Sequence, residues 1–466
     1  MAERDELLRK LTDYVCDGPA PSAAAMDTAR LCLLDALGCL AGALDAPDIG
    51  PILGPLVPGT VVPLGCRVPG TAYELDPVRA AFNTSALIRW LDFSDTTQRG
   101  GHPSDGIGAL LACADHVGRR GAAVTMREVF EAMVRTYEIQ GVIAETVKLD
   151  SPAVGLDAVF GVKLACAGVS ARLLGGDREE VANAFSNAVM DGGTLNAYRQ
   201  LPNTGTRKGW AGADAASRGV WFAMLAVAGE MGYPRPFTAT PWGFESVMLD
   251  GKPLALPPLG SSVMENVIFK LVPCQRNGST AAEAAIALHP RVGARLEQIR
   301  EIVVHTHSEA IERIDKTGPL PNAAARDHCL QFIVAAGLVF GEITSEHYHE
   351  PLALDPRIER LRSIMRVVEE PAYTRGYFDR AIMSCASAVE VAFTDGTKTG
   401  RIEVTHPAGD PQRRADALPN VRNKFNALAR KRWSEETRHS LLELFETPAR
   451  LGAMRVGEFL ERLTGD

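Results

Sequence analysis

The spacing of apolar residues over the first 260 positions is the strongest constraint on the fold of this chain. From about residue 5 onward, apolar side chains recur every three or four residues, and Gly, Pro, Ser and Asp separate the runs. That spacing gathers apolar side chains on one face of a helix. It predicts helices at 28–44, 76–92, 104–117, 126–146, 160–174, 178–191 and 210–230. The N-terminal residues predict one further, opening helix.

Two of these predicted helices are rich in small residues. GALLACAD starts at Gly108, and WAGADAASRGVWFAMLAVAG starts at Trp210. Small side chains let helices approach one another closely. We therefore expect both segments to be central helices of a packed bundle.

The sequence pattern changes near residue 265. The stretches 299–307 and 388–406 alternate apolar and polar residues, and the second contains an Asp395-Gly396 turn. Alternation of this kind is typical of β-strands, and the turn predicts a hairpin. Helical spacing returns between these stretches, at 322–340 and 355–365.

These patterns predict a mainly α fold with two domains. At 466 residues the chain is long enough for two or three folding units with ample cores. We expect a large all-helical domain over 1–265, completed by the charged, helical stretch 407–466. A smaller α+β domain is expected over 266–406.

Composition argues against several classes of partner. The chain carries 49 Lys and Arg against 57 Asp and Glu, whereas a dedicated nucleic-acid binder would normally show basic faces. The longest apolar run, about Val220–Ala228, is far shorter than the roughly 20 residues that span a bilayer. We therefore expect no nucleic-acid or membrane partner. The acidic, charged N-terminal residues resemble neither a secretory signal nor a transit peptide, so we expect a cytoplasmic protein.

The cysteines predict reduced, buried thiols. There are nine, an odd number, with no C-x-x-C pair, and most lie in apolar helical stretches. An iron–sulfur cluster usually draws at least two thiolates from a short spacing, so this pattern also argues against a cluster.

A polar loop between two predicted helices holds the first candidate site. The first helix should end near Asp92, and Ser104 is suited to cap the next. His102 then lies just before a helix N-terminus, where an anion is favoured. His102 and Asp92 could form a general base and its orienting carboxylate. The alternative is a capping loop with a solvated histidine.

Basic residues mark two further candidate positions. Arg199, Arg207 and Lys208 lie in one loop before a small-residue helix, an arrangement that suits a polycarboxylate or phosphate. The glycines of this loop do not fit a nucleotide P-loop. Lys270 begins the α+β insertion. Exposed loop cations and a hinge lysine are the alternatives.

Two pairs of histidines have a spacing that could supply metal ligands. His305 and His307 are two apart in a predicted strand, and His347 and His349 follow the same spacing. Neither pair has a convincing third ligand. We therefore expect no metal site.

Several stretches, taken in order, resemble the MmgE/PrpD family, and most closely its 2-methylcitrate dehydratase branch. The resemblance covers most of residues 25 to 430, which is far more specific than any single motif. The matching stretches include WLDFSDTTQRGGHPSD, PNTGTRKGWAGADAASRG, KTGPLPNAAARDHCLQF and FTDGT.

This resemblance implies a homodimer whose subunits have a large helical domain and a smaller α+β lid domain. It implies a carbon–oxygen lyase that dehydrates 2-methylcitrate, or a related 2-alkylcitrate, to the alkylaconitate by acid/base chemistry without a cofactor, as in propionate metabolism. The alternatives are a cis-aconitate-type decarboxylase and a non-catalytic relative that binds a tricarboxylate. Fungal members of the family can be mitochondrial.

The resemblance also points to individual residues. Five match family active-site positions: Asp92, Thr96, His102, Lys208 and Lys270. We expect His102, Asp92, Lys208 and Lys270 to be catalytic, and Thr96, Tyr198, Arg199, Arg207 and Gln275 to bind the substrate.

Two departures from the family pattern stand out. Where members usually carry a histidine, this chain has no imidazole near Asp157 or near Ser279. Loss of both would change the proton inventory and the volume of the pocket, which suggests a different, bulkier substrate unless these histidines are not essential.

Overall fold

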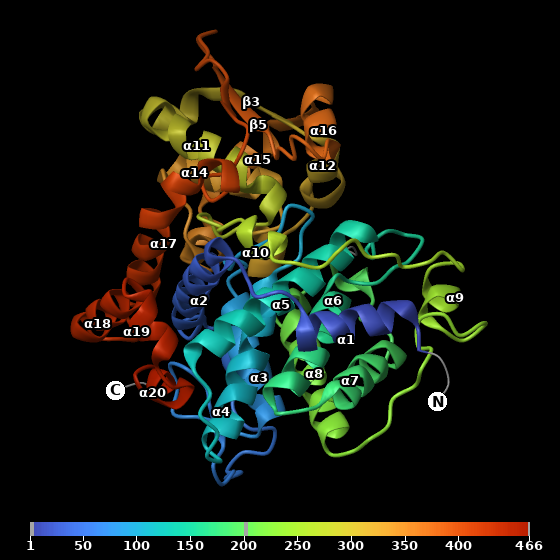
Figure 1. Ribbon diagram of the computed structural model, residues 1–466. Coiled ribbons are helices and arrows are strands. Elements are labelled where there is room, and N and C mark those ends of the chain that lie inside the picture. The colour runs from blue at the N-terminus through green and yellow to red at the C-terminus, as the bar shows by residue number, and fades with distance from the viewer. Residues whose placement is uncertain (1–3, 200–203, 465–466) are drawn as a thin grey trace. The chain divides into compact units, whose positions relative to one another are not determined.

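The computed structural model describes residues 4–199 and 204–464, and helices dominate it (Figure 1). The described residues form two compact units. The first comprises Met1–Ala197, Gly209–Val267 and Pro419–Asp466, and the second comprises Tyr198–Lys208 and Ile268–Leu418. The predicted fold class, mainly α with a smaller α+β part, is confirmed.

Helices of the first unit follow the predicted apolar spacing closely. The prediction for 126–146 coincides with α5, and the others begin or end within a few residues of the expected positions. Polar side chains fix several starts: Ser22 caps α2, and Asp76 caps α3. The helices are α1 (Glu6–Asp17), α2 (Ala23–Ala43), α3 (Pro77–Arg89), α4 (Ile107–Gly118), α5 (Met126–Thr146), α6 (Val159–Leu173), α7 (Arg178–Met190), α8 (Ala211–Val227), α9 (Phe244–Met248), α10 (Ser262–Glu265), α18 (Glu435–Phe445), α19 (Pro448–Ala453) and α20 (Val456–Glu461).

The most deeply buried helix of this unit is α6. Every residue from Val159 to Ala171 is buried, and the helix packs most extensively against α8. Close approach depends on small residues, because a side chain at Gly219 of α8 would collide with Cys166. The prediction that α4 and α8 are central helices is confirmed by their largely buried residues.

The second unit is built on a four-stranded sheet with the order β4-β3-β5-β6. β3 pairs parallel with β4 and antiparallel with β5, and β6 pairs antiparallel with β5. Gly396 has φ of 85° in the turn after β5, so the predicted hairpin is confirmed. The strands are β3 (Ile299–Thr306), β4 (Met365–Glu369), β5 (Ser387–Phe393) and β6 (Ile402–Val404). A separate two-stranded ribbon in the first unit joins β1 (Cys66–Arg67) to β2 (Glu74–Leu75).

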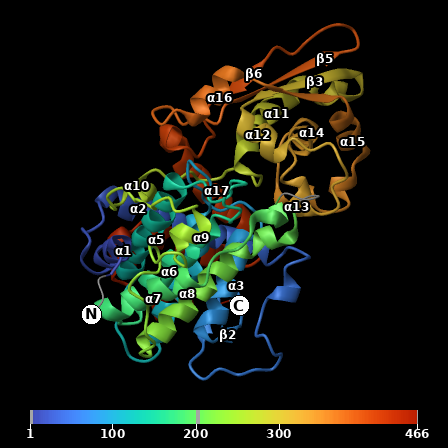
Figure 2. The same ribbon diagram turned by 90° about the vertical axis from the view of Figure 1, so that its right-hand side faces the viewer.

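Helices cover the sheet of the second unit (Figure 2). Val389, Val391 and Phe393 of β5 face the core formed with α11 and α14, because alternate strand residues point to one face. On the opposite face, Tyr373 of α16 packs against Ala388. The helices of this unit are α11 (Ser279–Val292), α12 (Ser308–Ile314), α13 (Ala323–Arg326), α14 (Leu330–Phe340), α15 (Pro356–Ser363) and α16 (Pro371–Phe378). Helix α17 (Arg414–Ala429) contributes its residues from Pro419 onward to the first unit.

One predicted helix is wrong in a way that matters for the site. The single helix expected at 322–340 is two helices, α13 and α14, separated by residues 327–329. Asn322 caps α13, and Cys329 has extended backbone angles before α14 begins. The apolar spacing continues through the break and therefore could not reveal it.

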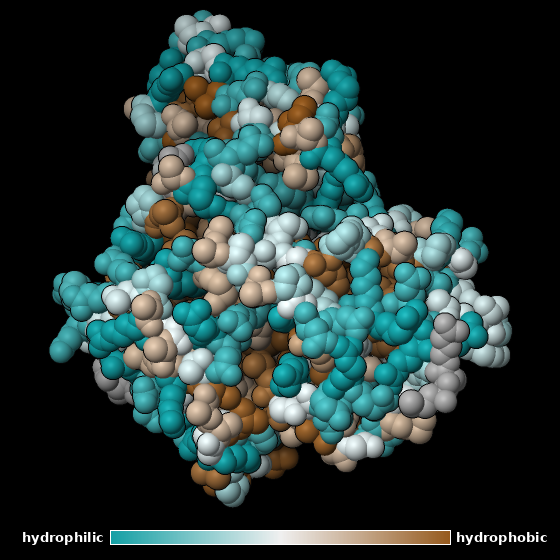
Figure 3. Space-filling model, viewed as in Figure 1, coloured by the Kyte–Doolittle hydropathy of each residue, from teal (hydrophilic) through white to brown (hydrophobic). Residues whose placement is uncertain are grey.

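The cysteines are free thiols, and the face of the molecule in Figure 3 is mainly polar. None of the nine cysteines forms a disulfide, and eight are buried, as predicted. Over residues 4–199 and 204–464, no helix is long and apolar enough to cross a membrane. Polar residues dominate the face shown in Figure 3, with apolar residues in scattered patches.

The packing of α6 leads to a stability prediction. A methyl group at Gly168 would overlap the buried ring of Phe185, whereas one at Gly161 of the same helix would lie 3.4 Å from its nearest neighbour. We expect Gly168→Ala to lower the free energy of unfolding by about 1–3 kcal/mol, since overpacking displaces the ring. Gly161→Ala should leave it unchanged or raise it by up to about 1 kcal/mol. Urea denaturation of both variants checks this, and equal effects would contradict the packing described.

Candidate active site

The loop after α3 brings the predicted His102–Asp92 pair together. Asp92 is a non-glycine residue with a φ of 48°, a conformation that costs roughly 1–2 kcal/mol. Its buried carboxylate lies 2.8 Å from Arg89 Nη1 and 3.4 Å from His102 Nε2. The two residues are therefore close enough to interact as the sequence predicts.

Both ring nitrogens of His102 face acceptor atoms. Nδ1 lies 2.8 Å from the backbone carbonyl oxygen of Asp95, which can only accept a hydrogen bond. Nε2 faces the carboxylate of Asp92, whose negative charge Arg89 balances. Two acceptors favour a ring that carries a proton on each nitrogen. This environment suits His102 for donating a proton.

The side chain of Asp95 fixes the loop below His102. Its buried carboxylate accepts hydrogen bonds from the Tyr137 hydroxyl at 2.8 Å and from the Ser104 backbone N–H at 3.3 Å. The predicted capping role of Ser104 is wrong, because the short 3-10 helix η2 (Pro103–Gly106) starts after His102. Ser104 lies inside η2, which precedes α4, and its backbone N–H donates to Asp95.

A buried lysine from the C-terminal part of the chain holds the other side of this loop. Lys424 of α17 donates to Asp35 Oδ1 at 2.7 Å and to the Phe93 carbonyl oxygen at 2.6 Å. Its ammonium group also lies 3.9 Å from the centre of the Phe93 ring. Thr96, the predicted substrate ligand in the loop, is buried and donates its hydroxyl to the Gly101 carbonyl oxygen at 2.7 Å. Its oxygen can still accept a hydrogen bond.

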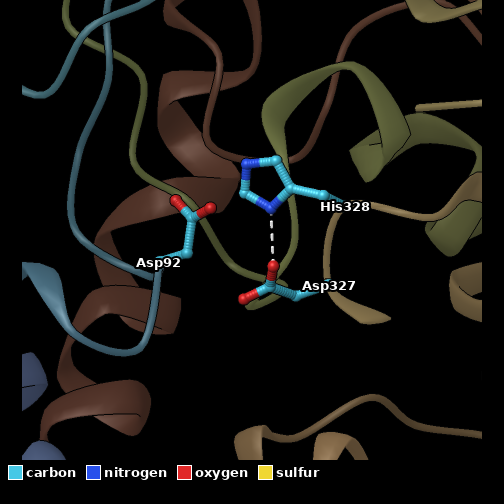
Figure 4. Close-up of side chains that lie close together, drawn as sticks. All are labelled: Asp92, Asp327 and His328. Carbon is cyan, nitrogen blue, oxygen red and sulfur yellow. Dashed lines mark hydrogen bonds and ion pairs between the residues drawn. The ribbon is translucent and has the colours of Figure 1, made fainter. Parts of the chain in front are cut away.

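In the second unit, the predicted Lys208 belongs to a buried chain of polar groups. Lys208 Nζ forms an ion pair with Asp327 Oδ2. Asp327 Oδ1 lies 2.6 Å from His328 Nδ1, the contact drawn as a dashed line in Figure 4. The backbone N–H of Gln275 donates to the Asp327 carbonyl oxygen at 2.9 Å. Asp327 therefore joins two residues that the sequence singled out. Asp92, also drawn in Figure 4, belongs to the first unit.

Asp327 and His328 were not among the predicted site residues. They lie in the Arg326-Asp327-His328-Cys329 stretch, whose polar character is ambiguous in isolation. The prediction of a continuous helix concealed them, because the break between α13 and α14 occurs at these residues. The sequence signal that could have revealed this break is the run of three polar residues, Arg326 to His328, before the apolar helix α14.

The remaining predicted site residues also lie in the second unit: the substrate ligands Tyr198, Arg199, Arg207 and Gln275, and Lys270, which is predicted to be catalytic. The guanidinium groups of Arg199 and Arg207 lie 5.0 Å and 5.9 Å from the centre of the Tyr198 ring. Lys270 is buried, at 3% exposure. The side chain of Gln275 accepts a hydrogen bond from the Asn277 backbone N–H at 2.7 Å and caps a short 3-10 helix, which ties its oxygen to a local role. Residues 200–203 of this loop lie outside the described part of the chain.

The two positions without the expected histidines are buried in structural settings. Asp157 Oδ1 accepts a hydrogen bond from the Val159 backbone N–H at 3.0 Å, at the start of α6. Ser279 is the first residue of α11, with its hydroxyl 3.8 Å from the thiol of Cys274. The Asp157 side chain therefore supports the start of α6, whereas the Ser279 hydroxyl contacts a neighbouring thiol.

The geometry of the second unit is unfavourable for metal binding by the histidine pairs. His307 Nδ1 accepts a hydrogen bond from the Ala310 backbone N–H and caps α12. Burial, with the nearby charge of Arg276, lowers the pKa of His307 to about 3, so the ring is neutral. His347 Nδ1 likewise accepts from the Thr344 backbone N–H at 3.0 Å. A neutral ring that accepts at Nδ1 carries its proton on Nε2, which disfavours metal ligation.

Comparison with known proteins identifies the family. The MmgE/PrpD N-terminal domain matches residues 9–257, and the MmgE/PrpD C-terminal domain matches residues 272–447. The chain belongs to the MmgE/PrpD family.

Several relatives named as 2-methylcitrate dehydratases, or as similar to them, align with most of this chain. A 2-methylcitrate dehydratase of Escherichia coli (strain K12) is 44% identical, over 98% of this chain and 97% of the relative. A mitochondrial 2-methylcitrate dehydratase of Yarrowia lipolytica is 42% identical, over 92% of this chain and 85% of the relative. The 2-methylcitrate dehydratase-like protein oryR of Aspergillus oryzae is 37% identical, over 98% and 95% respectively.

The buried carboxyl group of Asp95 leads to a prediction about pH. Burial raises its pKa to about 6 from the ordinary 3.8, with a further contribution from the charge of Asp35. The folded protein therefore binds this proton more tightly than the unfolded chain does, and stability falls as the pH rises from about 4 to about 6. We expect the unfolding free energy of the wild type to fall relative to Asp95→Asn, by up to roughly 1.4 kcal/mol per pH unit.

Urea denaturation of both proteins in steps from pH ~4 to pH ~7 measures this difference, and other titrating groups cancel in the comparison. The amide of the variant has no titrating proton in this range but can still hydrogen bond to Tyr137 and Ser104. A difference that is independent of pH, or that changes in the opposite direction, would show that Asp95 does not titrate as described.

Proposed function

We propose that this protein is a hydro-lyase that dehydrates 2-methylcitrate, or a related 2-alkylcitrate, to the corresponding alkylaconitate by acid/base chemistry without a cofactor. The observation that carries the proposal is 44% identity to 2-methylcitrate dehydratases over 98% of the chain. The contact of His102 with Asp92 agrees with it, because an elimination needs a group that can transfer a proton.

The chemistry of this elimination sets three requirements. The enzyme must neutralise the substrate carboxylates, remove a weakly acidic proton from the carbon next to one of them, and protonate the departing hydroxyl group. Hydroxide is a poor leaving group near neutral pH, so the proton donor is essential. Positively charged side chains, a proton acceptor and a proton donor together meet these three requirements.

We assign the proton donor to His102. Its two nitrogens face the Asp95 carbonyl oxygen and the Asp92 carboxylate, which favours the doubly protonated ring. Donation of one proton to the hydroxyl group releases water and leaves a neutral ring. Asp92 orients the ring in this assignment. Thr96, in the same loop, is assigned to hydrogen bond with the substrate.

Cations of the second unit are assigned to the substrate carboxylates. Arg199 and Arg207 flank Tyr198 and present planar groups suited to bidentate binding of a carboxylate. Lys270 supplies a buried positive charge. Lys208 differs, because Asp327 already pairs with its ammonium group. Its charge is therefore shared with a protein carboxylate and is not wholly available to the substrate.

The substrate test uses purified protein with 2-methylcitrate, citrate, longer 2-alkylcitrates and cis-aconitate. Absorbance of the conjugated alkene and release of CO2 are followed together. We expect alkene formation without CO2. Release of CO2 from cis-aconitate would instead establish a decarboxylase, and binding of a tricarboxylate without turnover would establish a non-catalytic relative.

The role of His102 is tested by substitution. We expect His102→Asn to lower kcat by about 100-fold or more, because the proton donor is lost, while the circular dichroism spectrum stays that of the wild type. His439→Asn is the control, since that side chain is 74% exposed on α18. A folded His102→Asn protein that turns over at the wild-type rate would remove His102 from the mechanism.

We also propose that the protein is a homodimer, in accordance with the family resemblance, and that it is located in the cytoplasm. Light scattering coupled to size-exclusion chromatography tests the dimer, and a monomer mass would contradict it. Cell fractionation tests the location. The name of the Yarrowia lipolytica relative makes mitochondria the alternative outcome.

A further inference from the structure

We propose that His328 is a second acid/base residue of this reaction, with Asp327 as the residue that orients it. The inference rests on the proposed dehydratase function. Elimination of water moves two protons, one from carbon and one to oxygen, and His102 accounts for only the second. The chain therefore needs a group that accepts a proton, and the second unit holds one in a defined orientation.

The geometry of this pair is that of a general base and its orienting carboxylate. Asp327 Oδ1 lies 2.6 Å from His328 Nδ1, and both side chains are buried, with 7% and 8% exposure (Figure 4). A carboxylate can only accept, so the ring carries its Nδ1 proton toward Asp327. In the neutral ring the lone pair is then on Nε2. Asp327 thus fixes the tautomer that can take up a proton at Nε2.

The backbone leaves its helical path at Asp327 and His328. Helix α13 ends at Arg326, and α14 starts at Leu330, which leaves Asp327 and His328 outside both helices. The Asp327 carbonyl oxygen accepts from the Gln275 N–H at 2.9 Å. Interrupting an apolar helix costs regular hydrogen bonds. Here the break positions one carboxylate against both His328 and Lys208.

Lys208 reduces the effect of the Asp327 charge on His328. A carboxylate next to a histidine stabilises the charged ring, so that a proton once accepted would be held tightly. The ammonium group of Lys208 forms an ion pair with the same carboxylate and offsets part of that effect. The imidazolium can then release its proton at the end of each cycle. Lys208 is in this view a positioning residue that tunes the pair.

The two histidines therefore have opposite tasks. His102 faces acceptors at both nitrogens and donates, whereas His328 has one nitrogen oriented by a carboxylate and accepts. In the reaction, the C–H bond breaks and its proton goes to His328 Nε2. The electron pair forms the C=C bond as the C–O bond breaks, and the hydroxyl takes a proton from the general acid of the reaction and leaves as water. Exchange of protons with solvent restores the acid and His328, so the atoms and charges balance.

The decisive variant is His328→Asn. The asparagine amide can still donate to Asp327 from the position of Nδ1 but has no basic nitrogen. We expect kcat on 2-methylcitrate to fall by about 100-fold or more, with KM changed much less. We also expect a larger kinetic isotope effect with substrate deuterated at the carbon that loses its proton, because that step becomes rate-limiting. His328→Gln is measured in parallel, in case the asparagine variant does not fold.

His347→Asn is the matched control. His347 is a buried histidine of the same unit, stacked on Phe340 and bonded to Thr344. A purely structural role for His328 predicts that both variants lose stability and keep the wild-type kcat and isotope effect. That outcome overturns the inference while leaving the dehydratase function intact. A wild-type protein that dehydrates none of the alkylcitrates overturns both.

Discussion

The loop that carries His102 depends on the buried ion pair between Lys424 and Asp35. Removing an ammonium and a carboxylate from water is costly unless they are paired and fully hydrogen bonded. Lys424 is paired with Asp35 and donates a second hydrogen bond to the Phe93 carbonyl oxygen, and both contacts offset part of that cost. The contact with Phe93 fixes the backbone just before Asp95, whose own carbonyl oxygen then orients the ring of His102. A chain of short contacts thus connects a helix near the C-terminus to the candidate proton donor.

Neutralised charge is the common feature of both groups of candidate residues. Asp92 is balanced by Arg89 in the first unit, and Lys208 is balanced by Asp327 in the second. A histidine adjoins each pair, at 3.4 Å and 2.6 Å respectively. The cost of burying isolated charges explains why each pair is complete before any substrate is present. In the proposed function, proton transfer is assigned to the histidine rings, and the carboxylates of the substrate are assigned to other cations, such as Arg199 and Arg207.

Much of the fold could be predicted from the sequence, and the reasons for the failures are physical. Periodic apolar residues located α5 at its exact bounds, and the turn at Gly396 predicted the hairpin of the second unit. The same periodicity hid the break at residues 327–329, because tertiary hydrogen bonds to Lys208 and Gln275, far away in the chain, determine it. For the site, spacing identified His102 with Asp92. No spacing rule could pair Lys208 with Asp327, since 119 positions separate them.

The origin of Lys424 has a consequence for the order in which the protein acquires its structure. Domains generally form as the chain emerges from the ribosome, beginning with the N-terminal parts. Residues 268–418 of the second unit are translated before Lys424, while Asp35 and Phe93 appear early. The second unit is therefore synthesised while the helices before it still lack Lys424. A nascent chain arrested anywhere before α17 would hold an incomplete first unit with the carboxylate of Asp35 still unpaired by its lysine.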